Sequence, residues 1–305
     1  MDRRVFLRLM AGAGAAGVMA GCGNEPAEPG AGATAAASPP AAGSPAVARV
    51  APDADPVLNV ISASYEQLTG TRPFAFGLVG PDNTPVTGAD AELWVVPQGG
   101  TGEPAGPFTT TYHEVEGQPL GLYVTEVELT EAGPTSFVAV TGDGRAGADD
   151  IQVATPESSQ IPAPGQEAVA VATPTEDKPL GFEKICTLDP PCGMHDISLD
   201  DALAKGRPVV LAFATPAFCQ TAVCGPSVGV VEEVRTTGAW GDVAFIHCEI
   251  FTDAGQTVAK PVKEWKLPSE PWLFTIDADG RINNRSDGPL MTLEDQVENM
   301  VQAVA

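Results

Sequence analysis

The stretch LAFATPAFCQTAVCGP, residues 211–226, decides the predicted fold. It joins the end of a continuous apolar run, RPVVLAFAT at 207–215, to a loop that carries two cysteines and then to Pro226. A run without polar alternation is typical of a strand buried on both faces. Proline is favoured in the first turn of a helix, so a helix is expected to begin close to Cys224. The sequence therefore predicts a central strand, a cysteine-bearing loop and a helix, in that order.

Segments on both sides extend this pattern. DVAFIHCEI at 242–250 and PWLFTID at 271–277 predict two more strands, and SLDDALAKG at 198–206 predicts a short helix. An amphipathic helix is expected from about Leu293 to Val304. Residues 180–305 thus alternate strands and helices, which is typical of an α/β domain.

Three stretches make residues 180–305 resemble the thioredoxin fold, in the branch of exported, membrane-tethered thioredoxin-like proteins. They are LAFATPAFCQTAVCGP, EPWLFTIDADGRI and the terminal amphipathic helix. The resemblance implies an α/β domain whose redox-active cysteines are Cys219 and Cys224. It also implies that Pro271, which opens the third strand, is cis and faces that pair. The loop departs from the family pattern, because thioredoxins place two residues between their cysteines and this sequence places four.

Which of the two cysteines is the nucleophile stays open at this stage. Counted from Phe213 on the strand, Cys219 takes the place of the family's first cysteine. Counted back from the helix, residues 224–227 read Cys-Gly-Pro-Ser and match the family's Cys-Gly-Pro-Cys with serine as the last member. The positive end of a helix dipole lowers the pKa of a thiol, which favours Cys224 as the low-pKa thiol. The alternative is an inert disulfide in this loop.

Two further cysteines, Cys186 and Cys192 in ICTLDPPCGMHD, bracket a turn with two prolines. We expect them to form a structural disulfide, which would stabilise the fold by restricting the unfolded chain. The alternative is a copper site, because Cys192, Met194 and His195 offer the thiolate, thioether and imidazole that copper prefers. Apart from that alternative, we expect no metal and no cofactor. Cys248 lies in an apolar strand and is expected to be a buried small hydrophobe.

Residues 57–155 follow a period of two residues, with short apolar segments separated by turn signals such as GPDN at 80–83. Seven short strands in about a hundred residues predict an all-β sandwich of immunoglobulin-like type. No cysteine lies in this domain. His113 alternates with apolar neighbours and is expected to be a surface strand residue rather than a metal ligand.

The first residues predict export. Arg3-Arg4, a short apolar run and Met19-Ala20-Gly21-Cys22 look like a twin-arginine signal peptide, residues 1–21, joined to a bacterial lipobox. Cleavage would leave Cys22 as the lipidated first residue. Residues 22–56 and 156–179 are rich in alanine and proline and predict flexible linkers. We therefore expect a lipid-anchored protein on the extracytoplasmic face of the cell membrane, where disulfides persist.

The formal charge of −24, from 16 basic and 40 acidic residues, excludes nucleic-acid binding through phosphate attraction. The expected partners are extracytoplasmic protein thiols and disulfides, with membrane contact through the lipid anchor only. The leading function is a thiol–disulfide oxidoreductase acting through Cys219 and Cys224.

Three alternatives stay open. A Sco-like copper chaperone would need His195 or His247, because no histidine follows Cys248. A peroxiredoxin-like thiol peroxidase is suggested by Thr221, which stands three residues before Cys224. A binding module without catalysis is the third. The sequence leaves open the direction of the redox chemistry and the role of the sandwich domain.

Overall fold

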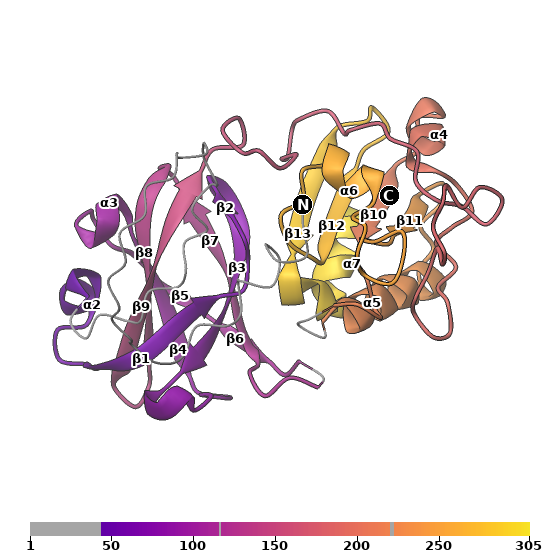
Figure 1. Ribbon diagram of the computed structural model, residues 1–305. Coiled ribbons are helices and arrows are strands. Elements are labelled where there is room, and N and C mark those ends of the chain that lie inside the picture. The colour runs from indigo at the N-terminus through magenta and orange to yellow at the C-terminus, as the bar shows by residue number, and fades with distance from the viewer. Residues whose placement is uncertain (1–43, 116, 220–222) are drawn as a thin grey trace, which may run out of the picture. The chain divides into compact units, whose positions relative to one another are not determined.

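The computed structural model describes residues 44–115, 117–219 and 223–305. Within these ranges the strands form two sheets, one of nine strands and one of four (Figure 1). The predicted signal peptide, Cys22 and the predicted linker as far as residue 43 lie outside the described residues. Among the helices that are described, none is long and apolar enough to cross a bilayer.

The larger sheet is built from the N-terminal half of the chain. Its strands are β1 (Asp55–Ser62), β2 (Gln67–Leu68), β3 (Gly70–Val79), β4 (Ala91–Val96), β5 (Ala105–Thr109), β6 (Thr111–His113), β7 (Leu122–Leu129), β8 (Gly133–Thr141) and β9 (Arg145–Ala154). They pair in the order β5-β4-β8-β9-β1-β3-β7-β6, and β2 pairs with β9. Short helical turns, η2 (Pro81–Asn83) and α3 (Pro97–Gly100), follow β3 and β4.

Curvature of this sheet encloses a core of large side chains. Phe74 of β3 stacks on Phe137 of β8 with ring centroids 4.2 Å apart, although two other strands separate β3 from β8 in the sheet. The two halves of the sheet are joined by β1 and β9, which pair in parallel. Gly147 permits this pairing, because a Cβ at this position would lie 2.1 Å from the carbonyl oxygen of Leu58. The predicted strands of 57–155 are therefore present, but in one continuous sheet.

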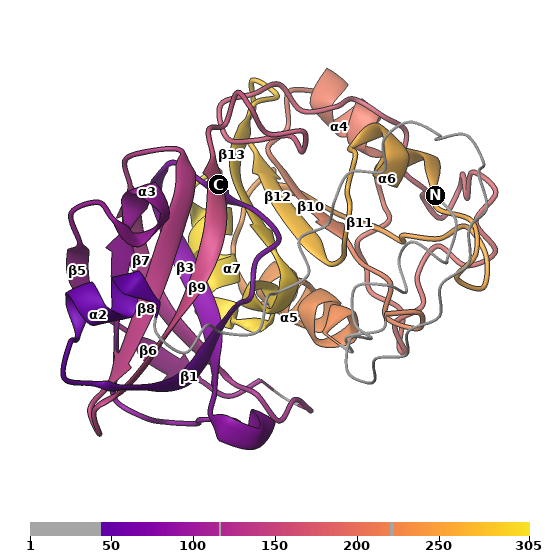
Figure 2. The same ribbon diagram turned by 60° about the vertical axis from the view of Figure 1, so that its left-hand side comes forward.

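The smaller sheet lies in the C-terminal half. Its strands are β10 (Val209–Phe213), β11 (Ala244–Cys248), β12 (Trp272–Ile276) and β13 (Ile282–Asp287), in the order β11-β10-β12-β13 (Figure 2). β10 and β11 are parallel, whereas β12 runs antiparallel to both of its neighbours. All residues of β10, β11 and β12 are buried, as continuous apolar runs predict.

Helices cover both faces of the smaller sheet. They are α4 (Leu199–Ala204), α5 (Cys224–Thr237), α6 (Lys260–Glu264) and α7 (Glu294–Gln302), with the turn η3 (Gly288–Thr292) before α7. Val210 and Ala212 of β10 pack with apolar residues of α5 and α7. Leu211 and Phe213 point to the opposite face and pack with residues of α4 and α6.

The structure corrects the predicted fold class. We expected an α/β thioredoxin-like domain preceded by an immunoglobulin-like sandwich, but the described chain is mostly β, with sheets of nine and four strands and few helices. Of the described helices only α5 and α7 are longer than six residues. Helix α6 has five residues and begins directly before Pro261, because proline lacks an amide hydrogen and suits only the first turn of a helix. No described helix or strand lies between β9 and α4.

The segment predicted as the second linker, 156–179, is packed against the smaller sheet. Its apolar residues Ile161 and Val171 are buried in the same cluster as Trp265. The indole nitrogen of Trp265 donates a hydrogen bond to the Val169 carbonyl at 3.1 Å. Composition predicted flexibility because the segment has few large apolar residues, yet packing and hydrogen bonds fix it in place.

Part of the first predicted linker is also folded. Residues Pro45–Val50 form helix α2, and its Ala46 and Val47 are buried against Val96 and Val138 of the larger sheet. Within the described residues, regular structure is therefore present twelve residues before the predicted boundary at 57.

We expect the packed segment 156–179 to contribute to stability. Replacing Ile161 with alanine removes a buried side chain, so the free energy of unfolding should fall by about 2–5 kcal/mol. Urea unfolding followed by tryptophan fluorescence measures this change. Glu157→Ala, at an exposed position of the same segment, is the control and should leave the unfolding midpoint unchanged. Equal midpoints for both variants would show that the segment is a free linker.

Candidate functional site

The predicted cysteine pair lies where β10 leads into α5. The chain turns after β10, with the Cys219 amide donating to the Thr215 carbonyl at 3.0 Å, and Cys224 is the first residue of α5. Cys219 is half-buried, whereas Cys224 is fully buried. Both sulfur atoms lie within 4.8 Å of each other and of a carboxylate oxygen of Glu270. The structure thus brings the two predicted cysteines together and adds an acidic residue that the sequence analysis missed.

Pro271 lies at the entrance to β12, next to Glu270. The Glu270–Pro271 peptide bond is cis, as the resemblance implied. Trp272 pairs with Phe213 across the sheet, so Pro271 stands opposite the residue that begins the cysteine loop. This register explains how Glu270, which is distant in the sequence, reaches the sulfur atoms.

Glu270 is an uncommon carboxyl group, because burial and neighbouring negative charge oppose its ionisation. Burial, followed by the charges of Cys219 and Glu249, raises its pKa to about 9. Its Oε2 atom is buried and accepts no hydrogen bond from the residues that the structure describes. The carboxyl is therefore protonated near neutral pH and can exchange a proton with a cysteine sulfur.

The pKa of Cys224 differs from our expectation. We expected the helix dipole to lower it, but burial, a hydrogen bond with Cys219 and the charge of Glu270 raise it far above that of a free thiol. The reason is one of magnitude: a helix terminus contributes about 0.3–1 kcal/mol, whereas desolvating a charge costs several kcal/mol. Burial therefore makes Cys219 the accessible sulfur of the pair and Cys224 the shielded one.

A second cluster contains the other predicted cysteine pair. The sulfur atoms of Cys186 and Cys192 lie 3.6 Å apart, without a bond between them. His195 Nε2 lies 3.3 Å and His247 Nδ1 lies 3.4 Å from the sulfur of Cys192. All four residues are buried, and one potential ligand atom from each lies within 4.8 Å of the others. The expected Cys186–Cys192 disulfide stays a prediction: its bond length would be about 2.05 Å, and the two sulfurs lie near enough for a small movement to form it.

The copper set considered from the sequence is only partly assembled. Cys192 and His195 belong to the cluster, but Met194 packs in the hydrophobic core of the α5 face. Its carbonyl oxygen accepts the His247 amide at 2.9 Å, which aligns this segment with β11. Cys186 and His247 take the remaining places. In the sequence, His247 could have been recognised as a candidate ligand because it lies inside an otherwise apolar strand.

Residues of the remaining alternatives are placed as follows. His195 and His247 both contact Cys192, and among the described residues no histidine joins the group formed by Cys219, Cys224 and Glu270. Thr221, the basis of the peroxidase alternative, lies outside the described residues. Cys248 is fully buried in β11, as expected.

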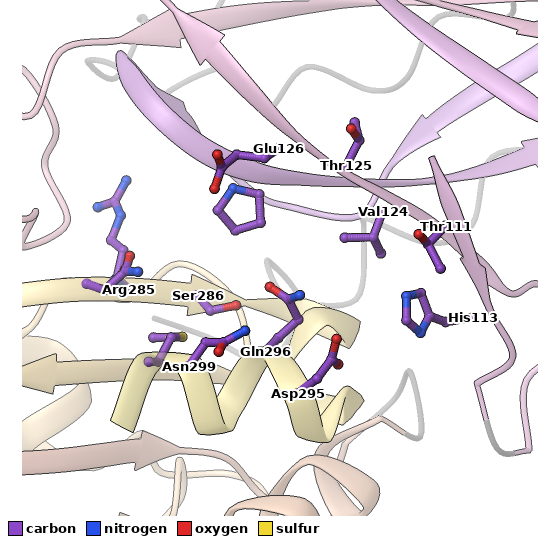
Figure 3. A pocket seen from close by; sticks show the side chains of 13 residues that line it. Thr111, His113, Val124, Thr125, Glu126, Arg285, Ser286, Asp295, Gln296 and Asn299 are labelled. Atoms are coloured by element: carbon purple, nitrogen blue, oxygen red, sulfur yellow. The ribbon is translucent and has the colours of Figure 1, made fainter. Parts of the chain in front are cut away.

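A cavity of 440 Å³ lies away from the cysteines, and no cysteine lines it. Figure 3 shows His113 and Thr111 of β6 on one wall and Asp295, Gln296 and Asn299 of α7 on the other. The alternating pattern predicted His113 to be a surface residue, and in the structure its side chain is partly exposed. The lining mixes polar side chains with apolar ones such as Val124 and Met300, and it contains no cysteine pair.

Comparisons with known proteins add little. No protein-family model and no curated protein matches the chain. Among solved structures, the Lin-41 filamin domain matches with 11% identity and a TM-score of 0.21, over 32% of this chain and 90% of its own. MtrC from Shewanella baltica OS185 matches with 15% identity and a TM-score of 0.21, over 34% of this chain and 23% of its own. Likenesses at this level carry no argument about fold or function.

The pKa of Glu270 predicts how stability depends on pH. Its raised value means that the folded protein holds this proton more tightly than the unfolded chain, whose carboxyl has a pKa of 4.5. Stability should therefore fall as the pH rises from about 5 to 9, by at most about 1.4 kcal/mol per pH unit. Glu270→Gln should reduce this slope in urea unfolding measured between pH 5 and 8, and the part due to the buried carboxyls of Asp287 and Glu249, whose pKa values are also raised, should remain.

The matched control is Glu264→Gln, at an exposed position of α6, which should keep the slope of the native protein. A Glu270→Gln variant with the same pH slope as the native protein would contradict a buried, protonated carboxyl at this position.

Proposed function

We propose that the protein is a thiol–disulfide oxidoreductase that acts through Cys219 and Cys224. The observation that carries this proposal is the meeting of two cysteine sulfurs and the carboxyl of Glu270 within 4.8 Å. One sulfur is half-buried and the other fully buried, so a partner can reach only the first. This asymmetry suits a pair in which one cysteine attacks and the other completes the exchange.

The exchange runs in two steps. The Cys219 thiolate attacks one sulfur of a partner disulfide, which forms a mixed disulfide and releases the partner's other sulfur as a thiolate. The protonated carboxyl of Glu270 gives its proton to this released thiolate, and the carboxylate that remains takes the proton of Cys224, which attacks the sulfur of Cys219. This releases the second partner sulfur and leaves a Cys219–Cys224 disulfide, so the partner is reduced and the pair oxidised. The reverse sequence oxidises a partner dithiol.

The partners that fit this site are proteins that carry accessible disulfides or thiols. Phe218, directly before Cys219, is one of the few large apolar side chains that are exposed in the described chain, with 36% of its surface accessible. An exposed aromatic ring beside the reactive sulfur offers contact to apolar side chains of a polypeptide. Small disulfides without such side chains would gain nothing from Phe218.

Single cysteine variants test the proposal. Cys224→Ser should accumulate covalent complexes with partner proteins, because the first step proceeds and the second is blocked. Cys219→Ser should form none, since the buried Cys224 cannot be reached. Both variants are expressed in the native cell envelope and analysed by non-reducing electrophoresis and mass spectrometry.

Cys248→Ala is the matched control, because it removes a buried cysteine that belongs to neither cluster, and it should behave like the native protein. Complexes with Cys219→Ser but not with Cys224→Ser would reverse the two roles. Complexes with neither variant would contradict the proposal.

We also propose that Cys22 carries a lipid that holds the protein at the extracytoplasmic face of the membrane. The support is the Met-Ala-Gly-Cys motif after a short apolar run and an arginine pair. Cys22→Ser should move the protein from the membrane fraction to the soluble fraction of fractionated cells. Gly23→Ser, a neighbouring change that keeps the cysteine, should leave it in the membrane fraction. Retention of Cys22→Ser in the membrane would contradict the anchor.

A further inference from the structure

We propose that Cys186, Cys192, His195 and His247 form a buried tetrahedral binding site for a zinc ion. The four residues lie outside the cysteine pair described above and have no part in its chemistry. Their ligand atoms, two sulfurs and two imidazole nitrogens, lie within 4.8 Å of one another. Two thiolates with two imidazoles are one of the donor sets of structural zinc sites.

The distances within the cluster agree with tetrahedral coordination. Zinc bonds of about 2.3 Å to sulfur and about 2.0–2.1 Å to nitrogen, at tetrahedral angles, place two sulfurs about 3.8 Å apart and sulfur and nitrogen about 3.6 Å apart. The two sulfurs are 3.6 Å apart, and the Cys192 sulfur lies 3.3 and 3.4 Å from the two imidazole nitrogens. Each of these separations is within about 0.3 Å of the expected value.

The histidine rings are oriented as ligands. Nε2 of His247 lies 3.2 Å from the Ala214 carbonyl oxygen, a partner to which it can only donate. The proton on Nε2 leaves Nδ1 with its lone pair directed at the cluster, and such an outer hydrogen bond commonly fixes the tautomer of a metal-bound histidine. His195 is 3% exposed, and its Nδ1 has no hydrogen-bond partner among the described residues. The polar contact of this buried ring is therefore the one that Nε2 makes with the Cys192 sulfur.

Charge and burial distinguish zinc from a disulfide. Two thiolates and two neutral imidazoles around a divalent cation carry no net charge, which suits a site inside an apolar cluster. The Cys192 amide also points to the Cys186 sulfur at 3.4 Å, a contact that stabilises a thiolate. A Cys186–Cys192 disulfide would use both sulfurs, and the two buried imidazoles would then have no thiolate or metal ion to contact. Zinc uses all four groups.

The position of the cluster gives the ion a structural role. Three ligands come from residues 186–195, which contain no helix or strand, and the fourth comes from β11, the edge strand of the smaller sheet. Residues next to the ligands hold the cysteine loop: Ala214 contacts His247, and the Ala217 amide donates to Thr187 Oγ1 at 3.0 Å. Zinc would join the irregular segment to the sheet edge and support the loop that leads to Cys219.

Metal binding is tested on the full chain. The protein is reduced with a phosphine, incubated with zinc chloride, passed through a desalting column and analysed by inductively coupled plasma mass spectrometry. About one zinc per chain is expected for a four-ligand site. Cobalt chloride in place of zinc should give the visible absorption of a tetrahedral cobalt–thiolate complex. A purified chain that retains no zinc, or that binds Cu⁺ but not Zn²⁺, would overturn the proposal.

Chemical protection adds a readout that does not depend on any variant. After zinc loading and treatment with oxidised glutathione, Cys186 and Cys192 should remain zinc-bound thiolates without a disulfide. Alkylation should label them only after a chelator has removed the zinc. A disulfide between them in the zinc-loaded protein would overturn the proposal.

Variants locate the ion. Cys192→Ser and His195→Gln should each lose stoichiometric zinc, and circular dichroism shows whether each variant is folded. Met194→Leu, between two ligands but with its side chain in the core, is the matched control and should keep zinc. The double variant Cys219→Ser/Cys224→Ser should also keep it. Loss of zinc from the double variant with retention by Cys192→Ser would place the ion at the other cluster and overturn the assignment.

Discussion

Burial of polar side chains at one end of the smaller sheet is the constraint on which the chemistry of this protein depends. β10 and β11 run in parallel and are buried along their whole length, and the two residues directly after each strand, 214–215 and 249–250, are buried as well. Cys224, Glu249 and Glu270 are all held where a charge is poorly solvated, and their pKa values rise for that reason. The thiol and the two carboxyl groups at this end of the sheet therefore hold their protons more tightly than the same groups do in water.

The two side-chain clusters share a single stretch of backbone. His247 contacts the carbonyl of Ala214 from one side, and Pro271 stands beside the same residue through the register of β12. Cys219 follows five residues later, with its amide fixed to Thr215. The two clusters are therefore connected by a short stretch of hydrogen-bonded backbone.

Much of the local structure could be predicted from the sequence, but less of its assembly. The apolar runs at 207–215 and 271–277 contain β10 and β12, because a strand buried on both faces has no polar alternation. The helices predicted at 198–206 and from about Leu293 to Val304 are each three residues shorter in the structure. Segment 156–179 was predicted to be a linker, because composition does not show which few apolar side chains are buried in a core. The resemblance to thioredoxin-like proteins implied that Cys219 and Cys224 form one pair, and the structure places their sulfurs close together. Glu270 did not, because only the register of β12 against β10 brings it to the sulfurs.

The contact between Cys192 and His247 spans 55 residues of sequence, whereas Cys186, Cys192 and His195 lie within one short segment. Closing so long a loop costs more chain entropy than joining residues of one short segment, and contacts between distant residues form slowly. An unfolded or half-synthesised chain thus presents an incomplete set of donors. All four groups come together only where the segment 186–195 lies against β11, which makes that geometry a marker of the native arrangement.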